Sequence, residues 1–404
     1  MLYSRTVTGP PAPRRYLAFE TEPCGLNNIL MQLEIMVVLA WLTRRTLVLP
    51  PPKPIYGLGS APRSLLDFLD LRALRERLDV VTAAEFSPLG DSHEAFHADM
   101  LARAHSPGWN AIEDVLVHPP DGLTVRLELI SRLWGRRPVG ISQAVDNCGV
   151  LYFPVTAEHR MFGVFEAFFL FADPENERRA RALVRDAIRY RPEIWQLAER
   201  AVSQAPLAAR SYSAMHVRRG DFQYNETRIG PHQILRHIAC LIPEGETVYL
   251  ATDETDPEFL RPFRERFQLV QFRDLASGVV ADTPSEWIGI VETLICAAAP
   301  QRFVGTRLST FSTRIATLRG HLSYGSGRHA GIDTALYYTQ PPLWHARPEE
   351  QYPYAVPRRK HRDEHGETST PWWQSIAREP VWGRAYEAVW ADAGLQSMPE
   401  PHDA

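Results

Sequence analysis

The sequence predicts an α/β protein of two domains, and three observations carry this prediction. The chain has 404 residues, more than one hydrophobic core usually supports. Residues 16–50 fit a strand, a loop, an amphipathic helix and a second strand. Residues 213–319 alternate strands with helices, which is typical of a parallel, doubly wound sheet. We therefore expect an N-terminal domain at 1–204, a C-terminal domain at 205–340 and a tail at 341–404 that packs across both.

Composition and charge argue against several classes of protein. The chain carries 44 basic and 48 acidic residues, a formal net charge of −4, which argues against a broad nucleic-acid-binding surface. The cysteines are Cys24, Cys148, Cys240 and Cys296. Cys240 and Cys296 lie within apolar helical patterns, so they fit core positions better than disulfide partners. This usage indicates a reducing compartment.

The amino terminus and the hydropathy pattern predict where the protein resides. Residues 1–15 lack the apolar core of a secretory signal. No stretch approaches the roughly 20 apolar residues that a membrane span needs. We therefore expect a cytoplasmic protein without a membrane or nucleic-acid partner, and the sequence leaves its oligomeric state open.

The first β-α-β unit begins with a strand candidate at Tyr16–Glu20. Apolar residues from Ile29 to Trp41 then recur at the spacing of an amphipathic helix, with Asn27 or Asn28 as its N-cap, and Thr46–Leu49 follows as a strand. Free N–H groups at such a helix start favour an anion or a polar ligand. A plain capping turn is the alternative.

Residues 93–97 read His-Glu-Ala-Phe-His, the pattern in which two histidines one helical turn apart bind zinc. Met100 occupies the position where one zinc-protease family continues with glycine. The flanking loops favour a surface helix. A zinc-dependent hydrolase using His93, Glu94 and His97 stays an alternative.

The middle of the chain predicts helices and a linker. The aromatic-rich run 161–172 is too short to span a membrane and is expected to be a core helix. Residues 176–189 and 194–203 fit two amphipathic helices. The segment 205–209, with Pro206, is the expected link between the domains.

In the second half, each predicted strand ends in a polar loop. The predicted strands are 213–218, 247–251, 268–272 and 302–304, and the predicted helices are 231–242, 256–266, 285–299 and 310–319. The loop sequences are HVRRGDF, ATDET and VGTRLSTFS. Carboxyl ends of parallel strands meet at one edge, where open α/β sheets bind ligands.

The first of these loops carries groups that suit a phosphate. The planar guanidinium of Arg218 matches phosphate oxygens, and His216 lies on the same strand face. An anionic ligand is one interpretation. The other is that Arg218 or Arg219 forms a structural salt bridge with Asp221 or Asp253, and that His216 is an ordinary, partly buried histidine.

The other two loops add candidates for a nucleotide site. Ser309, Thr310 and Ser312 open a helix after Gly305, where hydroxyl and N–H groups can hold a diphosphate. Asp253 can accept hydrogen bonds from a ribose or a base. No Gly-x-Gly-x-x-Gly follows a strand and no Walker lysine is present, which disfavours dinucleotide oxidoreductases and P-loop NTPases.

Four segments together resemble the GDP-fucose protein O-fucosyltransferase family. They are Cys24–Asn28 with the following helix, HVRRGDF, VYLATDE, and the block from Glu292 to Gly320. The resemblance implies an inverting, metal-independent glycosyltransferase of the GT-B type, with two Rossmann-like domains that face a cleft. The acceptor side is then the N-terminal domain, and the GDP-sugar donor binds against the C-terminal domain. The resemblance further implies GDP-fucose as the donor substrate, no cofactor, and a hydroxyl of a protein or glycan as the acceptor.

The resemblance also implies roles for particular residues in the C-terminal domain. Arg218 matches the arginine that binds the β-phosphate and the glycosidic oxygen of the donor, with His216 beside it. Asp253 matches a nucleoside contact. The turn that holds the phosphates corresponds to Ser309, Thr310 and Phe311.

In the N-terminal domain, the resemblance places Gly25 and Asn27 in the loop that faces the sugar. One branch of the family has a glutamate as general base where this chain has Cys24. Glu22 and Glu20 are nearby candidates for the base, and a mechanism without a protein base is the other option. A GDP-sugar-binding protein without turnover is therefore the second functional hypothesis. Arg218, Asn27 and Glu22 are the expected catalytic residues.

Overall fold

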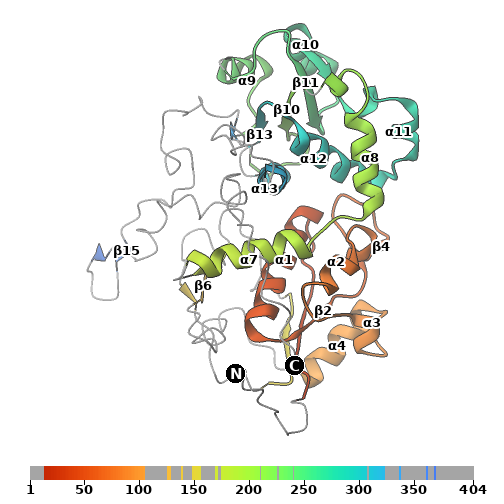
Figure 1. Cartoon of the computed structure of the whole chain (residues 1–404), viewed down its shortest axis with the longest axis vertical. Coiled ribbons are helices and arrows are strands. Elements are labelled where there is room, and N and C mark those ends of the chain that lie inside the picture. The colour runs from red at the N-terminus through yellow and green to blue at the C-terminus, as the bar shows by residue number, and fades with distance from the viewer. Residues whose placement is uncertain are drawn as a thin grey trace, which may run out of the picture.

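We describe a computed structural model of the chain. The described residues are 13–104, 125–128, 138–139, 148–155, 169–171, 174–209, 211–224, 227–239, 241–306, 309–323, 336–337, 361–362 and 368–369. They form two units, each built around a parallel sheet (Figure 1). Of the predicted C-terminal tail, the structure describes two short strands, β15 (His361–Arg362) and β16 (Thr368–Ser369), which pair antiparallel.

The first unit contains a four-stranded parallel sheet in the order β5-β2-β1-β8. Its strands are β1 (Tyr16–Phe19), β2 (Thr46–Leu49), β5 (Val80–Thr82) and β8 (Val150–Phe153). Tyr16 pairs with Thr46 on one side and with Val150 on the other, so all four carboxyl ends share one edge. The strand predictions at 16–20 and 46–49 are confirmed, the first with an end one residue earlier.

The helix α1 (Leu26–Thr43) follows β1, and Gly25 is its N-cap. The backbone N–H groups of Asn28 and Ile29 both donate to the carbonyl of Gly25. The prediction of Asn27 or Asn28 as N-cap is therefore wrong. The helix begins earlier because the extended backbone of Gly25 already accepts the first helical hydrogen bonds, without a capping side chain.

Helix α1 also contradicts the prediction that no stretch of the chain approaches the apolar length of a membrane span. Its 18 residues have a mean hydropathy of 1.5, so by length and composition it could cross a membrane. Within this structure 78% of that window is buried, between the first sheet and neighbouring helices. A helix that is apolar on all sides is expected where it is enclosed by protein on all sides.

Other elements surround this sheet. They are β3 (Lys53–Pro54), β4 (Pro62–Arg63), a 3₁₀ turn at Leu65–Asp67, α2 (Leu71–Arg75), α3 (Ala83–Phe86), α4 (His93–Arg103), α7 (Pro174–Ala187), and a sheet of β7 (Pro138–Val139), β6 (Val125–Glu128) and β9 (Phe169–Phe171). The strand β9 overturns part of the core helix predicted at 161–172, whereas 161–168 lie outside the described residues. A short apolar run does not distinguish helix from strand by periodicity, and aromatic residues favour strands.

The second unit is a five-stranded parallel sheet in the order β12-β11-β10-β13-β14. The strands are β10 (Tyr212–Val217), β11 (Thr247–Thr252), β12 (Gln268–Val270), β13 (Phe303–Gly305) and β14 (Leu336–Tyr337). In chain order this is 3-2-1-4-5, a doubly wound Rossmann-like sheet. The central strand β10 is buried throughout, which explains its nearly continuous apolar sequence. The predicted parallel sheet is confirmed.

Helices cover both sheets and connect the units. In the second unit they are α8 (Pro192–Val202), α9 (Pro231–Ile238), α10 (Pro257–Arg266), α11 (Ser277–Asp282), α12 (Ile288–Ala298) and α13 (Thr310–Ser323). Helix α12 starts three residues later than predicted because Ser285–Trp287 form a 3₁₀ turn before it. Helix α9 ends four residues earlier than predicted. Helix α8 packs against α12 (Figure 1).

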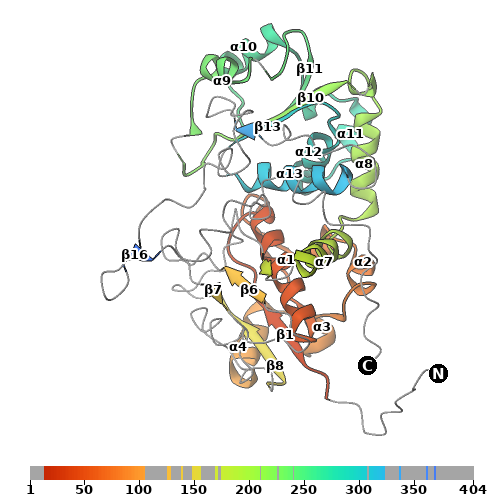
Figure 2. The ribbon, with the colours of Figure 1, turned by 60° about the vertical axis from the view of Figure 1, so that its left-hand side comes forward.

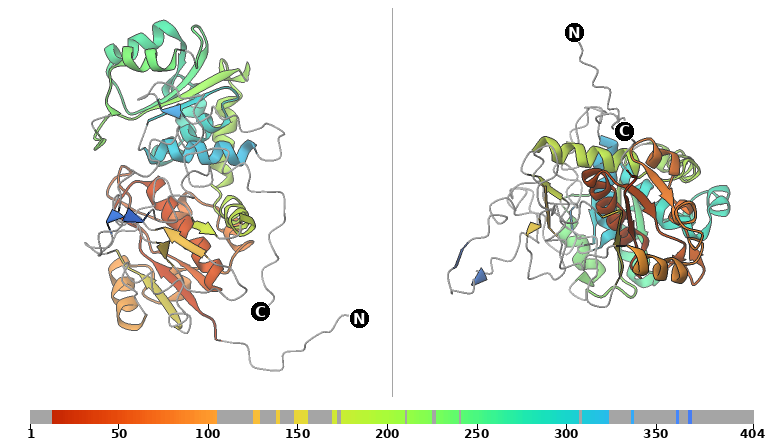
Figure 3. Two further views of the ribbon diagram at one scale, coloured as in Figure 1. Left: turned by 90° about the vertical axis from the view of Figure 1, so that its left-hand side faces the viewer. Right: turned by 90° about the horizontal axis from the view of Figure 1, so that it is seen from below.

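The two units contact each other through α1 and α13, whose axes cross (Figures 2 and 3). A buried ion pair joins them: Arg314 Nη1 lies 2.9 Å from Glu34 Oε1, and both side chains are almost fully buried. A second contact lies nearby, where Arg63 pairs with Glu286 at 2.9 Å. One cluster of buried apolar side chains extends through both units.

Candidate active site

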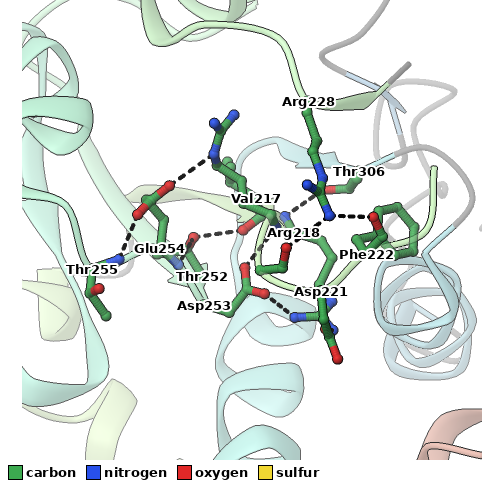
Figure 4. Close-up of polar contacts among 12 residues, drawn as sticks. Val217, Arg218, Asp221, Phe222, Arg228, Thr252, Asp253, Glu254, Thr255 and Thr306 are labelled. Atoms are coloured by element: carbon green, nitrogen blue, oxygen red, sulfur yellow. Dashed lines mark hydrogen bonds and ion pairs between the residues drawn. The ribbon is translucent and has the colours of Figure 1, made fainter. Parts of the chain in front are cut away.

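The candidate site forms where β10 and β13 end next to each other. The Arg218 backbone N–H donates to Thr306 Oγ1 (2.8 Å) (Figure 4). The Thr306 hydroxyl donates to the carbonyl of His216 (2.9 Å). The Thr306 N–H donates to Ser312 Oγ (2.8 Å) on α13. Thr306 thereby connects the loop after β10, residues 218–222, to the start of α13. We call this loop, which carries Arg218 and Arg219, the arginine loop. Sequence reasoning did not single out Thr306, although its position directly after a strand was a usable signal.

The Arg218 side chain is held by two carboxylates. Its Nη1 donates to Asp253 and its Nη2 donates to Asp221, so the salt bridges that the sequence left as one alternative are present. A guanidinium has five N–H donors, so these two bonds leave others for a ligand. The side chain is 28% exposed. Burial, and then the nearby charge of Arg228, lower the pKa of Arg218. The structural pairing and a phosphate-binding role are therefore compatible in one side chain.

Arg219 has a structural role. Its Nε lies 2.9 Å from Glu254 Oε2, its Nη1 donates to the carbonyl of Ile229 (3.0 Å), and its Cζ lies 4.2 Å from the centroid of the Phe259 ring. Its backbone N–H donates to Asp253 Oδ1 (2.7 Å). The two adjacent arginines are thus distinguished by their partners, since Arg218 pairs with Asp221 and Asp253 whereas the Arg219 side chain contacts Glu254, Ile229 and Phe259.

His216 is buried beneath the loop. Its Nδ1 lies 2.7 Å from Ser312 Oγ, and its ring stacks on Phe311 with centroids 4.4 Å apart. Burial, and then the charge of Arg218, lower the pKa of His216 to about 3. The imidazole is therefore neutral at neutral pH, and positive charge for an anion comes from Arg218 instead.

The amino end of α13 completes this group. Thr313 N donates to the carbonyl of Ser309 (3.0 Å), and Ser309 is buried, whereas Thr310 and Phe311 are half-buried. A β-carbon on Gly305 would lie 2.6 Å from Ser312 Oγ, so this strand end needs glycine. The structure thus brings together the C-terminal residues that the sequence predicts: His216, Arg218, Asp253, Ser309, Thr310 and Phe311.

The N-terminal candidates lie in the loop before α1. Gly25 forms a β-bridge with Tyr56, and Asn27 lies half-buried in the first turn of the helix. Glu22 is only 2% exposed, and its backbone N–H donates to Gln32 Oε1 (3.3 Å). The buried position disfavours easy access of an acceptor to Glu22. Its role as general base stays a prediction.

The histidines of the predicted surface helix form a cluster with Glu20. Glu20 Oε1 lies 3.2 Å from His93 Nε2 and 2.8 Å from His97 Nδ1. Burial would raise the pKa of Glu20, but the hydrogen bond with His93, the Val155 N–H and both histidine charges lower it to about 2. Glu20 is therefore a weak base, which argues against it as the base for a hydroxyl.

The same cluster bears on the zinc alternative. His93 Nε2 and His97 Nδ1 both lie within ion-pair distance of Glu20 Oε1, and His97 Nδ1 also lies 2.8 Å from Tyr152 OH. Among the residues that the structure describes, no group of three or more His, Cys, Asp and Glu could hold a metal ion. The geometry accordingly favours an ion-paired cluster at this position.

The carboxyl of Glu292, a half-buried residue on α12, predicts a measurable pH dependence. Burial raises the pKa of Glu292 on α12 to about 8, although Tyr249 OH lies 3.3 Å from its Oε1. In the unfolded chain the carboxyl ionises near its usual pKa of about 4.3. The contribution of the neutral Glu292 carboxyl to the free energy of unfolding is therefore complete below that pH, and it is lost as the pH rises through about 8.

We therefore expect Glu292→Gln to change stability little at pH 4.5 and to raise it at pH 8.5, by up to about 5 kcal/mol. Urea unfolding at the two pH values measures this. Glu265→Gln, at an exposed position on α10, is the matched control and should show no such difference. Equal effects of Glu292→Gln at both pH values would contradict the raised pKa.

Two Rossmann-like units, with an arginine and a helix start at the carboxyl edge of the second sheet, define a GT-B glycosyltransferase. The chain belongs to the GDP-fucose protein O-fucosyltransferase family, whose model matches residues 16–322. This confirms the resemblance inferred from the four sequence segments.

Two solved fucosyltransferases are similar to the chain, and no curated protein matches its sequence. POFUT1 in complex with GDP is 14% identical, with a TM-score of 0.42, and the match covers 81% of this chain and 98% of POFUT1. The α-1,6-fucosyltransferase NodZ, soaked with GDP-fucose, is 16% identical, with a TM-score of 0.44, and the match covers 76% of this chain and 92% of NodZ. Another crystal structure of NodZ is from Bradyrhizobium.

Proposed function

We propose that the protein transfers fucose from GDP-fucose to a hydroxyl of a protein or glycan acceptor, with inversion and without a metal ion. The observation that carries this proposal is the placement of Arg218 at the end of β10, tied through Thr306 to the start of α13. Family membership supplies the donor. The proposal places the reaction in the cytoplasm, where the low cysteine usage fits a reducing environment.

The proposed chemistry centres on the leaving group. When the bond between the sugar and the β-phosphate oxygen breaks, negative charge develops on GDP. Arg218 and the N–H groups at the start of α13 stabilise that charge. A well-placed donor of this kind contributes about 3–4 kcal/mol. Asp221 and Asp253 hold the plane of the guanidinium, so little reorganisation is needed as the charge forms.

The acceptor hydroxyl attacks the sugar from the face opposite to GDP, which gives inversion. Gly25 and Asn27, at the start of α1, are proposed to face the sugar, and Glu22 is the proposed proton acceptor. Because Glu22 is buried, departure of GDP is expected to contribute more to the rate than removal of the proton.

Binding of the donor provides the first test. We expect GDP and GDP-fucose to raise the melting temperature in the presence of EDTA, because Arg218 supplies the charge that a metal ion supplies in other transferases. At a ligand concentration of 100 times Kd, the stabilisation is about 2.7 kcal/mol. Thermal shift measures it, with UDP-glucose as a control. A shift that EDTA abolishes would contradict the metal-independent proposal.

Turnover decides between an enzyme and a GDP-sugar-binding protein without activity. We propose the enzyme, and slow hydrolysis of GDP-fucose to GDP is sufficient evidence when no acceptor is known. Binding of GDP-fucose without any release of GDP would favour the binding protein.

A further inference from the structure

Arg228 contacts the arginine loop, although it lies in none of the motifs that the sequence analysis identified. Its Nη2 donates to the carbonyl of Gly220 (2.8 Å) and to the carbonyl of Phe222 (2.6 Å) (Figure 4). These two carbonyls flank Asp221, and Asp221 accepts a hydrogen bond from Arg218 Nη2. The Arg228 guanidinium is therefore hydrogen-bonded on both sides of Asp221, the residue that pairs with Arg218.

The loop has a tight backbone that such a bond can stabilise. The Phe222 N–H donates to the carbonyl of Arg219 (3.2 Å), which closes the turn. A β-carbon on Gly220 would collide with the Asp253 carboxylate, so the chain passes close to Asp253. Asp221 itself is exposed, with 55% of its side chain accessible. Because hydrogen bonds from a charged donor are stronger than neutral ones, Arg228 is well suited to fix the carbonyls around Asp221.

The charge of Arg228 fits a loop that binds an anion. It lies close enough to Arg218 that, after burial, it is the next cause of the lowered pKa of Arg218. Like charges placed together repel each other, and a bound anion offsets that repulsion. The position of Arg228 is thus consistent with a neighbouring diphosphate, while its Nη2 donates to the loop carbonyls of Gly220 and Phe222.

We propose that Arg228 is a positioning residue: it fastens residues 220–222 around Asp221 and thereby orients the Arg218 guanidinium toward the donor diphosphate. This inference rests on the proposed function for the identity of the donor. The contacts with the loop do not depend on it.

The test compares Arg228→Met with Arg261→Met, an exposed arginine on α10 that pairs with Glu258. For Arg228→Met, kcat for GDP-fucose turnover is expected to fall by about 10²-fold, as for a misplaced catalytic group, while Kd for GDP changes by less than about threefold. Arg261→Met is expected to resemble the wild type. An unchanged kcat in Arg228→Met would overturn the proposal, as would a loss confined to GDP affinity, which would indicate direct phosphate contact.

Chemical rescue separates positioning from a general loss of structure. Guanidinium at about 10 mM, far below denaturing concentrations, is expected to restore part of the turnover of Arg228→Ala by bridging the same carbonyls. Methylammonium at equal concentration is expected to restore less, because it lacks the planar fork. A lowered melting temperature together with no rescue would overturn the proposal in favour of a purely structural role.

Hydrogen exchange of the backbone amides in residues 218–224 provides a readout that needs no substrate. Exchange is expected to be faster in Arg228→Met than in the wild type or Arg261→Met. If exchange accelerates but the wild type neither binds GDP nor turns over GDP-fucose, the proposed function fails and the positioning of the loop stands. If the wild type is active but exchange is unchanged, the positioning role is wrong.

Discussion

Arg218→Lys is expected to lower the turnover of GDP-fucose by about 10²–10³-fold in a protein that stays folded. Lysine keeps the positive charge but lacks the planar fork, so it cannot bind two carboxylates and a phosphate at the same time. Asp221 and Asp253 would compete with the phosphate for one ammonium group. GDP release, by hydrolysis or by transfer, measures the rate, and circular dichroism confirms the fold.

The neighbouring arginine provides the matched control for this prediction. Arg219→Lys removes contacts with Glu254, Ile229 and Phe259, all within the second unit. It is expected to reduce stability while the folded fraction keeps most of its turnover. Near wild-type turnover in folded Arg218→Lys would show that Arg218 is a structural arginine, and a loss specific to Arg219→Lys would transfer the catalytic role to that residue.

Arg314→Met is expected to lower the free energy of unfolding by about 3–5 kcal/mol. Arg314 Nη1 lies 2.9 Å from Glu34 Oε1 in the buried contact between α1 and α13, and its Nε donates to Tyr190 OH (3.1 Å), between α7 and α8. The substitution removes the Arg314 ion pair from a buried carboxylate and the hydrogen bond to Tyr190. Urea unfolding and the melting temperature both measure the loss.

Two further variants test the cause of that loss. Adding Glu34→Gln to Arg314→Met is expected to recover part of the stability, because a neutral amide is less costly to bury than a carboxylate. The exposed Arg261→Met is expected to change stability by no more than about 0.5 kcal/mol. A loss below about 1 kcal/mol in Arg314→Met would show that water or another group compensates Glu34.

The local sequence predicted the central strands of both sheets because they carry their own signal, whereas the edge strands β5 and β14 were not predicted. Residues 16–20, 46–49 and 213–218 are short apolar runs bounded by polar or turn residues, and each is a strand within one residue at either end. The helix predicted at 161–172 is wrong where the structure describes this segment, because Phe169–Phe171 form a strand. An aromatic-rich run of that length fits either a helix or a strand, and antiparallel pairing with β6 decided the outcome.

The sequence by itself determined the α/β class, the alternation that produces the doubly wound second sheet, and the strand ends that carry His216, Arg218 and Asp253, because these depend on periodicity and on residues adjacent in the chain. Only the tertiary structure decided how those side chains are partnered. Glu34 and Arg314 are 280 residues apart, and Arg228 reaches back across a turn to carbonyl groups. Such contacts leave no periodic signal, since folding brings together groups whose sequence positions are unrelated.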